Sequence, residues 1–292
     1  MFDRFANSAR LDVFFARYEA LAAGAVSIQP HHFSLALERL HPEMASIAQA
    51  EAPQTPPAPP SSGDDLRLSE DSKQILRSAA EQARRLWLEE MGHWRGLRGL
   101  FHRREWQVDS RHLLLALMLQ RGSPTEEVRA RLFAPGALAP TVRGPVGLLS
   151  GEQRRTGKLA TALLCAQYEA NRLVSGSIRP EHLLLGLIFA SVHLRKPKAA
   201  VDLFGPIGTV RQEVEAMCLA TPPPPAEPDP DTAQTLKYAA EEATARSDTR
   251  VGTGHLMLGL LRVDHRFPKD YLNRRGIQLD TARAALSEPD LL

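Results

Sequence analysis

The chain has 292 residues, a formal net charge of +2 and 43% hydrophobic residues. A length of this order predicts about two domains, and so small a charge excludes a dedicated nucleic-acid-binding protein, which carries strongly basic surfaces. Cys165 and Cys218 are the only cysteines and are too far apart for a disulfide framework or a zinc motif. The sequence shows neither a signal-peptide pattern nor a long apolar run, so we expect a cytoplasmic protein with no membrane span.

A ten-residue motif occurs four times, each time with a histidine at its fifth position. The motif has the form (Ile/Val)-x-x-x-His-(Phe/Leu)-x-Leu-(Ala/Gly)-Leu. The four histidines are His32, His112, His182 and His255. An Ala-x-x-(Glu/Gln)-Ala element precedes each copy, with its last alanine 12 residues before the histidine in three copies and 29 in the second. Internal repetition of this kind predicts one structural unit per repeat.

Each repeat is expected to contain two main helices. Alanine, leucine, glutamate and arginine dominate, apolar residues recur at intervals of three and four, and no convincing alternating strand is present. Ser69 and Asp229 are suitable starts for a first helix, and the histidine motif itself starts a second helix that should be buried. This second helix carries Gly186 and Gly259 in two repeats, which predicts that another helix backbone passes close to them.

The elements that we expect resemble the amino-terminal domain of the Clp-family protein unfoldases. In that family a helix is followed by Gly-Thr-Glu-His-(Ile/Leu)-Leu-Leu-Gly-Leu and then by two shorter helices, all duplicated in tandem. Residues 178–187, together with 166–170, match this pattern best, and the fourth repeat matches well. The resemblance implies an all-α protein with two Clp-N-like domains, each a pseudo-twofold pair of small helical repeats.

The resemblance places the two domains at residues 1–135 and 146–292, with proline-rich linkers between repeats. The first domain departs from the family pattern, because its first repeat is short after residue 51 and its second has no clear final helix beyond Phe133. We expect no ATPase module of the family within these 292 residues. The stretch 151–159 lacks the spacing and the Ser or Thr of a phosphate loop, so we expect no nucleotide and no other cofactor.

Glu181 is the repeat residue with the clearest ligand chemistry. In family members that recognise phosphorylated arginine, the glutamate before this histidine pairs with the guanidinium, and a helix start holds the phosphate. The resemblance assigns the corresponding threonine to Thr156, with Ser150 as a competing helix start. Glu181 and Thr156 are thus candidates for binding phosphoarginine or a peptide. The other three repeats have His31, Arg111 and Gly254 in place of Glu181, so a carboxylate that only interacts with the helix dipole is the competing interpretation. The histidines have no metal-ligand spacing, and we expect them to close hydrogen bonds at helix starts.

An insertion in the second repeat, residues 87–106, holds all three tryptophans of the chain among arginines. Its candidate interface residues are Trp87, Trp94, Arg95, Arg98, Phe101 and Trp106. Aromatic and arginine side chains are enriched at protein interfaces and also form base-stacking platforms. The insertion therefore either packs on its own domain or binds a partner; nucleic acid is the weakest alternative, because glutamates interrupt the basic run.

The sequence favours a non-enzymatic protein-binding module. It would act as an adaptor, regulator or decoy for a Clp-type unfoldase or protease, binding substrates or partner proteins without ATP. A structural protein that assembles with an unrelated partner through the insertion is one alternative. An enzyme is the other, but no nucleophile with a base, no paired carboxylates and no metal-ligand spacing support it. Neither the bound proteins nor the oligomeric state follows from the sequence.

Overall fold

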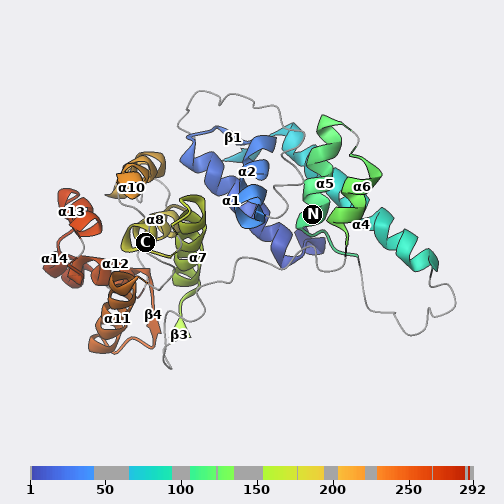
Figure 1. Ribbon diagram of the computed structural model, residues 1–292. Helices are drawn as coiled ribbons and strands as arrows, with labels where there is room; N and C mark the ends of the chain where they lie inside the picture. The colour runs from blue at the N-terminus through green and yellow to red at the C-terminus, as the bar shows by residue number, and fades with distance from the viewer. Residues whose placement is uncertain are drawn as a thin grey trace. The chain divides into compact units, whose positions relative to one another are not determined.

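The structure, a computed structural model, forms two compact units, Met1–Thr141 and Val142–Leu292. It describes residues 2–42, 66–93, 106–122, 124–134, 154–175, 177–193, 203–220, 229–264, 266–286 and 289. Helices make up both units (Figure 1), and the only strands among the described residues are two residues long. The predicted all-α class is confirmed.

Unit 1 holds the first two repeats. Its elements are η1 (Phe2–Arg4), α1 (Asn7–Ala22), β1 (Ser27–Ile28), α2 (Pro30–Leu40), β2 (Arg67–Leu68), α4 (Glu70–His93), α5 (Ser110–Arg121) and α6 (Glu126–Leu132). In each repeat the first helix packs against the histidine helix, α1 against α2 and α4 against α5. The core lies along these contacts and includes Phe15, Tyr18 and Phe33.

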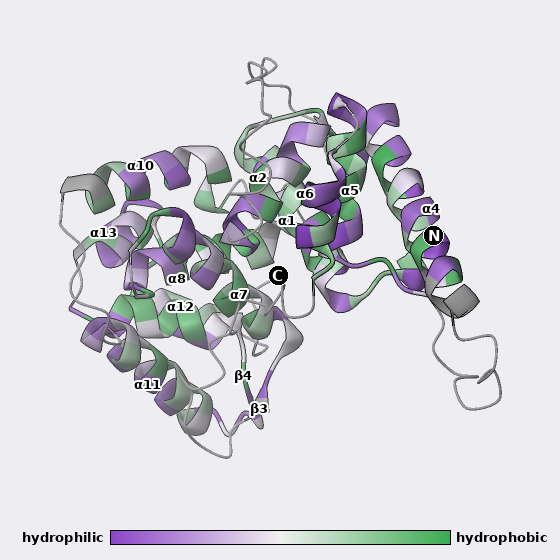
Figure 2. Ribbon diagram, turned by 45° about the vertical axis from the view of Figure 1, so that its right-hand side comes forward, coloured by the Kyte–Doolittle hydropathy of each residue, from purple (hydrophilic) through white to green (hydrophobic). Residues whose placement is uncertain are grey.

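Unit 2 holds the third and fourth repeats. Its elements are β3 (Arg154–Arg155), α7 (Gly157–Arg172), α8 (Pro180–His193), α10 (Ile207–Ala220), α11 (Pro230–Ala245), β4 (Arg250–Val251), α12 (Thr253–Arg262), α13 (Arg266–Arg274) and α14 (Leu279–Ala285). The pairs α7 with α8 and α11 with α12 repeat the arrangement of unit 1. The histidine helices are the buried centre of the unit, as predicted, and α12 is largely apolar in Figure 2.

Short parallel strands join the two repeats of each unit. β1 pairs with β2 in unit 1, and β3 pairs with β4 in unit 2. An isolated bridge between Phe5 and Val108 is the unit 1 counterpart of β3 and β4, because it too joins the residues before the first helix of one repeat to those before the histidine helix of the other. These contacts place each first helix beside the histidine helix of the opposite repeat.

The same hydrogen bonds recur at equivalent positions in the two units. The backbone N–H of Ala6 donates to Val108 O at 2.8 Å, and that of Thr156 donates to Val251 O at 3.0 Å. At the other junction, the Ser72 hydroxyl donates to Ile28 O at 2.7 Å, and the Thr232 hydroxyl donates to Ile178 O at 2.8 Å. Each unit is thus held together by the same pair of junctions between its two repeats.

Candidate functional site

The four repeat histidines close the starts of their helices. In every repeat the ring Nδ1 lies at hydrogen-bond distance from the backbone N–H of the residue three positions earlier. The distances are 2.9 Å for His32, 3.2 Å for His112, 3.0 Å for His182 and 3.1 Å for His255. This is the contact that glutamate or glutamine makes in a capping box. The prediction that these histidines close hydrogen bonds at helix starts is confirmed.

Burial keeps two of these rings neutral near pH 7. It lowers the pKa of His32 and of His182 to about 4, so that Nδ1 is free to accept the backbone hydrogen bond. The Nε2 atom of His255 lies 3.0 Å from Asp248 Oδ2. Among the described residues, no group of three or more His, Cys, Asp or Glu side chains is arranged to hold a metal ion.

Cys218 and His182 form a close thiol and imidazole pair, with Sγ 4.0 Å from Nε2. Burial raises the pKa of the Cys218 thiol, and burial lowers the pKa of His182. A nucleophilic cysteine needs the opposite arrangement, a thiolate beside an imidazolium. The pair is therefore not poised for nucleophilic catalysis.

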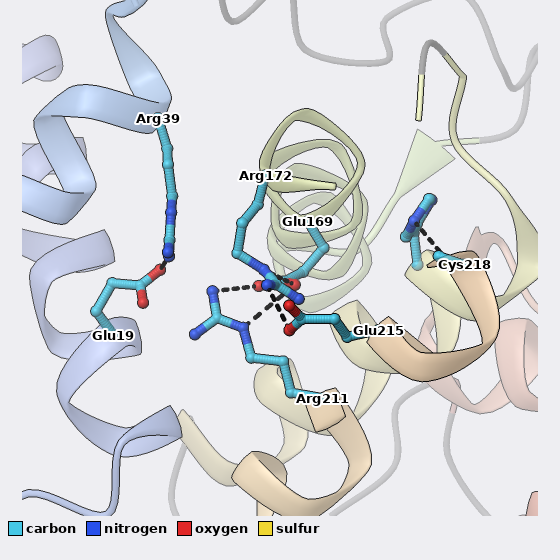
Figure 3. Close-up of polar contacts among 8 residues, drawn as sticks. Glu19, Arg39, Glu169, Arg172, Arg211, Glu215 and Cys218 are labelled. Carbon is cyan, nitrogen blue, oxygen red and sulfur yellow. Dashed lines mark hydrogen bonds and ion pairs between the residues drawn. The ribbon is translucent and has the colours of Figure 1, made fainter. Parts of the chain in front are cut away.

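The glutamate of the Ala-x-x-Glu-Ala element is buried and paired with arginine in three repeats, and Figure 3 shows the pairs of Glu19 and of Glu169. Arg39 pairs with Glu19, and Arg262 and Arg283 pair with Glu242. Glu169 is held by Arg172 at 2.8 Å and Arg211 at 3.0 Å. Sequence reasoning missed these pairs, although Arg39 and Arg262 both stand seven residues after the repeat histidine. These ion pairs join helices within each unit, and the carboxylates of Glu19, Glu169 and Glu242 are engaged in them.

Thr156 and Glu181 lie at opposite ends of α7. The Thr156 hydroxyl caps that helix by accepting the Leu159 N–H at 3.1 Å. Glu181 is in the first turn of α8, next to His182, whose ring interacts electrostatically with Glu169 near the end of α7. The exposed fraction of Glu181 is only 5%. A ligand that touches both residues would have to span α7, so the structure does not bring the two together into one compact pocket.

The insertion in the second repeat lies mostly outside the described residues, and this includes Trp94, Arg95, Arg98 and Phe101. Trp87 is half-buried on the extended α4, where the neighbouring Leu88 is 51% exposed. Trp106 packs within its own unit, because the Arg4 guanidinium lies 5.3 Å from the centre of its ring. The two described tryptophans thus have different surroundings: Trp87 has the exposed Leu88 as its neighbour, whereas Trp106 contacts Arg4 of the same unit.

A pocket of about 610 Å³ opens between α10 and α13 in unit 2. It is lined by Met217, Phe267, Asp270, Asn273 and Arg274. Its apolar surface comes from a thioether and a phenyl ring, and its polar groups come from one face of α13. A concave apolar site of this volume with a few polar groups is typical of sites that bind a ligand or a partner's side chain. Methionine adapts its shape to different partners.

The wall of this pocket is fixed by contacts between the third and fourth repeats. The Tyr271 hydroxyl donates to the Phe204 carbonyl oxygen just before α10. The Arg274 guanidinium lies 3.5 Å from the Glu213 carboxylate across the two helices. Gly205, at φ +81°, leaves room for the Arg275 side chain. Because helices from both repeats are needed, no single repeat contains this pocket, and sequence reasoning did not anticipate it.

None of the described helices is long and apolar enough to cross a bilayer.

The chain is similar to a Clp-family domain and to several bacterial proteins. The Clp repeat (R) N-terminal domain family matches residues 154–273. The chaperone protein ClpB of Oceanobacillus iheyensis is 30% identical over 132 residues, which cover 44% of this chain and 16% of ClpB. The proteins Mb2686 of Mycobacterium bovis and Rv2667 of Mycobacterium tuberculosis, whose names describe no function, are each 29% identical over 168 residues, 56% of this chain.

The chain spans 62% of the length of these mycobacterial relatives and a much smaller share of ClpB. The family match begins at β3 and ends in α13, so it contains both histidine helices of unit 2 and every pocket-lining residue except Arg274. Residues 154–273, the third and fourth repeats, are therefore similar to the Clp repeat (R) N-terminal domain.

Proposed function

We propose that the chain is a non-enzymatic binding protein whose unit 2 captures an apolar side chain of a protein partner in the pocket between α10 and α13. The observation that carries this proposal is the pocket itself. Met217 and Phe267 offer a large apolar side chain a place to bury, and Asp270, Asn273 and Arg274 surround them with groups that can bond to a peptide backbone. An apolar centre with a polar rim is the common design of a protein-binding surface.

The partner that we propose is an unfolding protein chain or a component of a Clp-type unfoldase, which would place the function in the cytoplasm. The similarity of residues 154–273 to the Clp repeat (R) N-terminal domain supports this choice. We also propose that unit 1 is a second, divergent Clp-N-like domain, since the junctions at Val108 and Ile28 have the hydrogen bonds of those at Val251 and Ile178. Two linked domains suit an adaptor, which gains effective concentration by binding cargo and unfoldase together.

The test measures binding of the full chain to two separate probes, a permanently unfolded test protein and a purified ClpB-type unfoldase. An adaptor binds both, a decoy binds the unfolded protein and slows its processing by the unfoldase, and a protein with an unrelated partner binds neither. Phe267→Ser with Met217→Ser should weaken binding at least about tenfold, the loss of one apolar anchor. Val174→Ser is the matched control, because Val174 is an exposed apolar residue of the same unit outside the pocket.

Equal binding by the pocket variant and the control would exclude the pocket as the binding site. The second candidate is assembly through α4, which the exposed Leu88 beside Trp87 supports. Loss of binding in a variant with Trp87→Ala and Leu88→Ala, with the pocket variant unaffected, would select this candidate.

A further inference from the structure

Helix α4 is longer than the first helices of the other three repeats. It has 24 residues, whereas α1, α7 and α11 have 16 each. Those three helices end two residues after the last alanine of the Ala-x-x-(Glu/Gln)-Ala element, which in α4 is Ala83. Residues 86–93 therefore extend α4 past the part that the repeats share, and Figure 1 shows this end of the helix projecting from unit 1.

An apolar side chain lies between opposite charges on the exposed side of α4. Leu88 is 51% exposed, and the neighbouring Trp87 is half-buried. Arg85 and Glu89 are exposed as well, and Arg85 Nε donates to Glu89 Oε1 at 2.9 Å. Positions three and four residues apart are neighbours on a helix surface, so Arg85, Leu88 and Glu89 share one side of α4. We call these three residues the α4 face.

The order of the charges on the α4 face does not suit the helix itself. An ion pair four residues apart stabilises a helix more when the acidic residue comes first, and here Arg85 comes first. Glu89 also stands near the C-terminal end of α4, where the helix dipole favours a cation. Both side chains are more than half exposed, so the pair adds little stability. An electrostatic partner outside the helix explains these charges better.

A second copy of α4 that runs in the opposite direction has the complementary charges. A twofold axis beside Trp87 relates position 85 of one helix to position 89 of the other, because both positions are two residues away from Trp87. Arg85 of each copy then meets Glu89 of the other, and the two Leu88 side chains meet next to the axis. An apolar centre between two charged pairs is the pattern of a self-complementary interface. A parallel pair of helices would instead bring like charges together.

We propose that the α4 face is a dimerisation surface that binds a second copy of this chain, with the two α4 helices antiparallel. Helices that overlap symmetrically about Trp87 share residues 81–93, a length of about 20 Å. A contact of this length belongs to the small, weak class of protein interfaces, so we expect a dissociation constant in the micromolar range. The α4 face is separate from the pocket between α10 and α13 and does not depend on it.

Sedimentation velocity of the full chain over a range of concentrations measures this dimer. Arg85→Glu and Glu89→Arg should each weaken it at least about tenfold, because each change places like charges opposite one another. Arg77→Glu is the matched control, since it makes the same change of charge at an exposed position of α4 outside residues 81–93, and it should dimerise as the unaltered chain does. All three positions are exposed, so the variants should keep their helical circular dichroism.

A mixture of the two charge variants tests the pairing itself. Arg85→Glu leaves two acidic side chains on the α4 face and Glu89→Arg leaves two basic ones, so an equimolar mixture should recover a heterodimer. The chain that carries both substitutions should recover the homodimer. Neither single variant can form the ion pair between positions 85 and 89 within one helix, so recovery in the mixture can come only from contacts between copies.

Three results would overturn the proposal. One is an unaltered chain that stays monomeric at every concentration, which would mean that its own chain or a different protein covers the α4 face. The others are single variants that dimerise as well as the control, and a mixture that forms no heterodimer. None of these measurements depends on Met217 or Phe267, so failure of the dimer is distinguishable from failure of the pocket.

Discussion

The Cβ atom that Gly186 lacks would lie 2.0 Å from the carbonyl oxygen of Ala162. α8 therefore crosses α7 with its backbone almost in contact, and Gly259 repeats this approach against Thr235 O at 2.4 Å. The prediction that these glycines mark a close helix crossing is confirmed. In unit 1 the equivalent positions are Ala36 and Ala116, both buried, so the helices there accept a methyl group.

Gly186→Ala should lower the free energy of unfolding of unit 2 by about 1–3 kcal/mol, because the two helices must move apart. Gly157→Ala is the control and should be neutral or slightly stabilising, since it meets no neighbour. Circular dichroism during urea denaturation measures both units, whereas tryptophan fluorescence reports only on unit 1, which holds Trp87, Trp94 and Trp106. If Gly186→Ala shifted the urea transition seen by tryptophan fluorescence and left the one seen by circular dichroism unchanged, the destabilised unit would be unit 1, which would contradict this prediction.

Acid should destabilise unit 2 through His182. Its pKa is about 4 in the folded protein, below the ordinary 6.5, so the unfolded chain takes up a proton first as the pH falls. The stability that this neutral ring contributes is complete above pH 6.5 and is lost between pH 6.5 and 4, by roughly 3 kcal/mol.

His182→Gln keeps an acceptor for the Arg179 amide but cannot be protonated. Urea denaturation at pH 7.5, 5.5 and 4.5 should show a weaker loss of unit 2 stability in this variant than in the unaltered chain. Identical pH dependence in the two proteins would show that His182 is not the titrating group.

Val174→Gly should stabilise unit 2. Val174 follows α7 with φ +50° and is 80% exposed, so its branched side chain is strained and has little to pack against. Gly24 holds the equivalent place after α1 with φ +65°. We expect a gain of about 1 kcal/mol, measured as a rise in the thermal midpoint. Val26→Gly is the comparison: Val26 is exposed, is not among the described residues with positive φ, and should gain nothing.

Phosphoarginine binding remains a prediction for Glu181, with Thr156 as a residue to test separately. If Glu181 pairs with the guanidinium, calorimetry with free phosphoarginine should give heat that Glu181→Ala abolishes while the helical circular dichroism stays unchanged. Because Thr156 lies at the other end of α7, Thr156→Val should leave this binding intact. Absence of heat from the unaltered chain would assign Glu181 to the helix dipole alone.

The sequence was sufficient to predict the all-α class and the four helix starts, each with its histidine. These features depend on contacts between residues three or four positions apart, such as the 3.0 Å hydrogen bond between Arg179 N and His182 Nδ1, so a local pattern is sufficient to reveal them. The close helix crossings at Gly186 and Gly259 could also be predicted from the sequence. Glycine lowers the stability of a helix, so its presence there indicates a contact that compensates for this loss.

Only the tertiary structure decided which helix starts meet. Thr156 bonds to Val251 of the opposite repeat and not to the turn of α8 that carries Glu181, and the Gly254 amide bonds to Pro289. The pocket of Met217 and Phe267 likewise joins two repeats. Such neighbours are set by the packing of whole helices across tens of residues of chain, and a local pattern that is repeated four times does not specify which helix start of one repeat contacts which residue of the other.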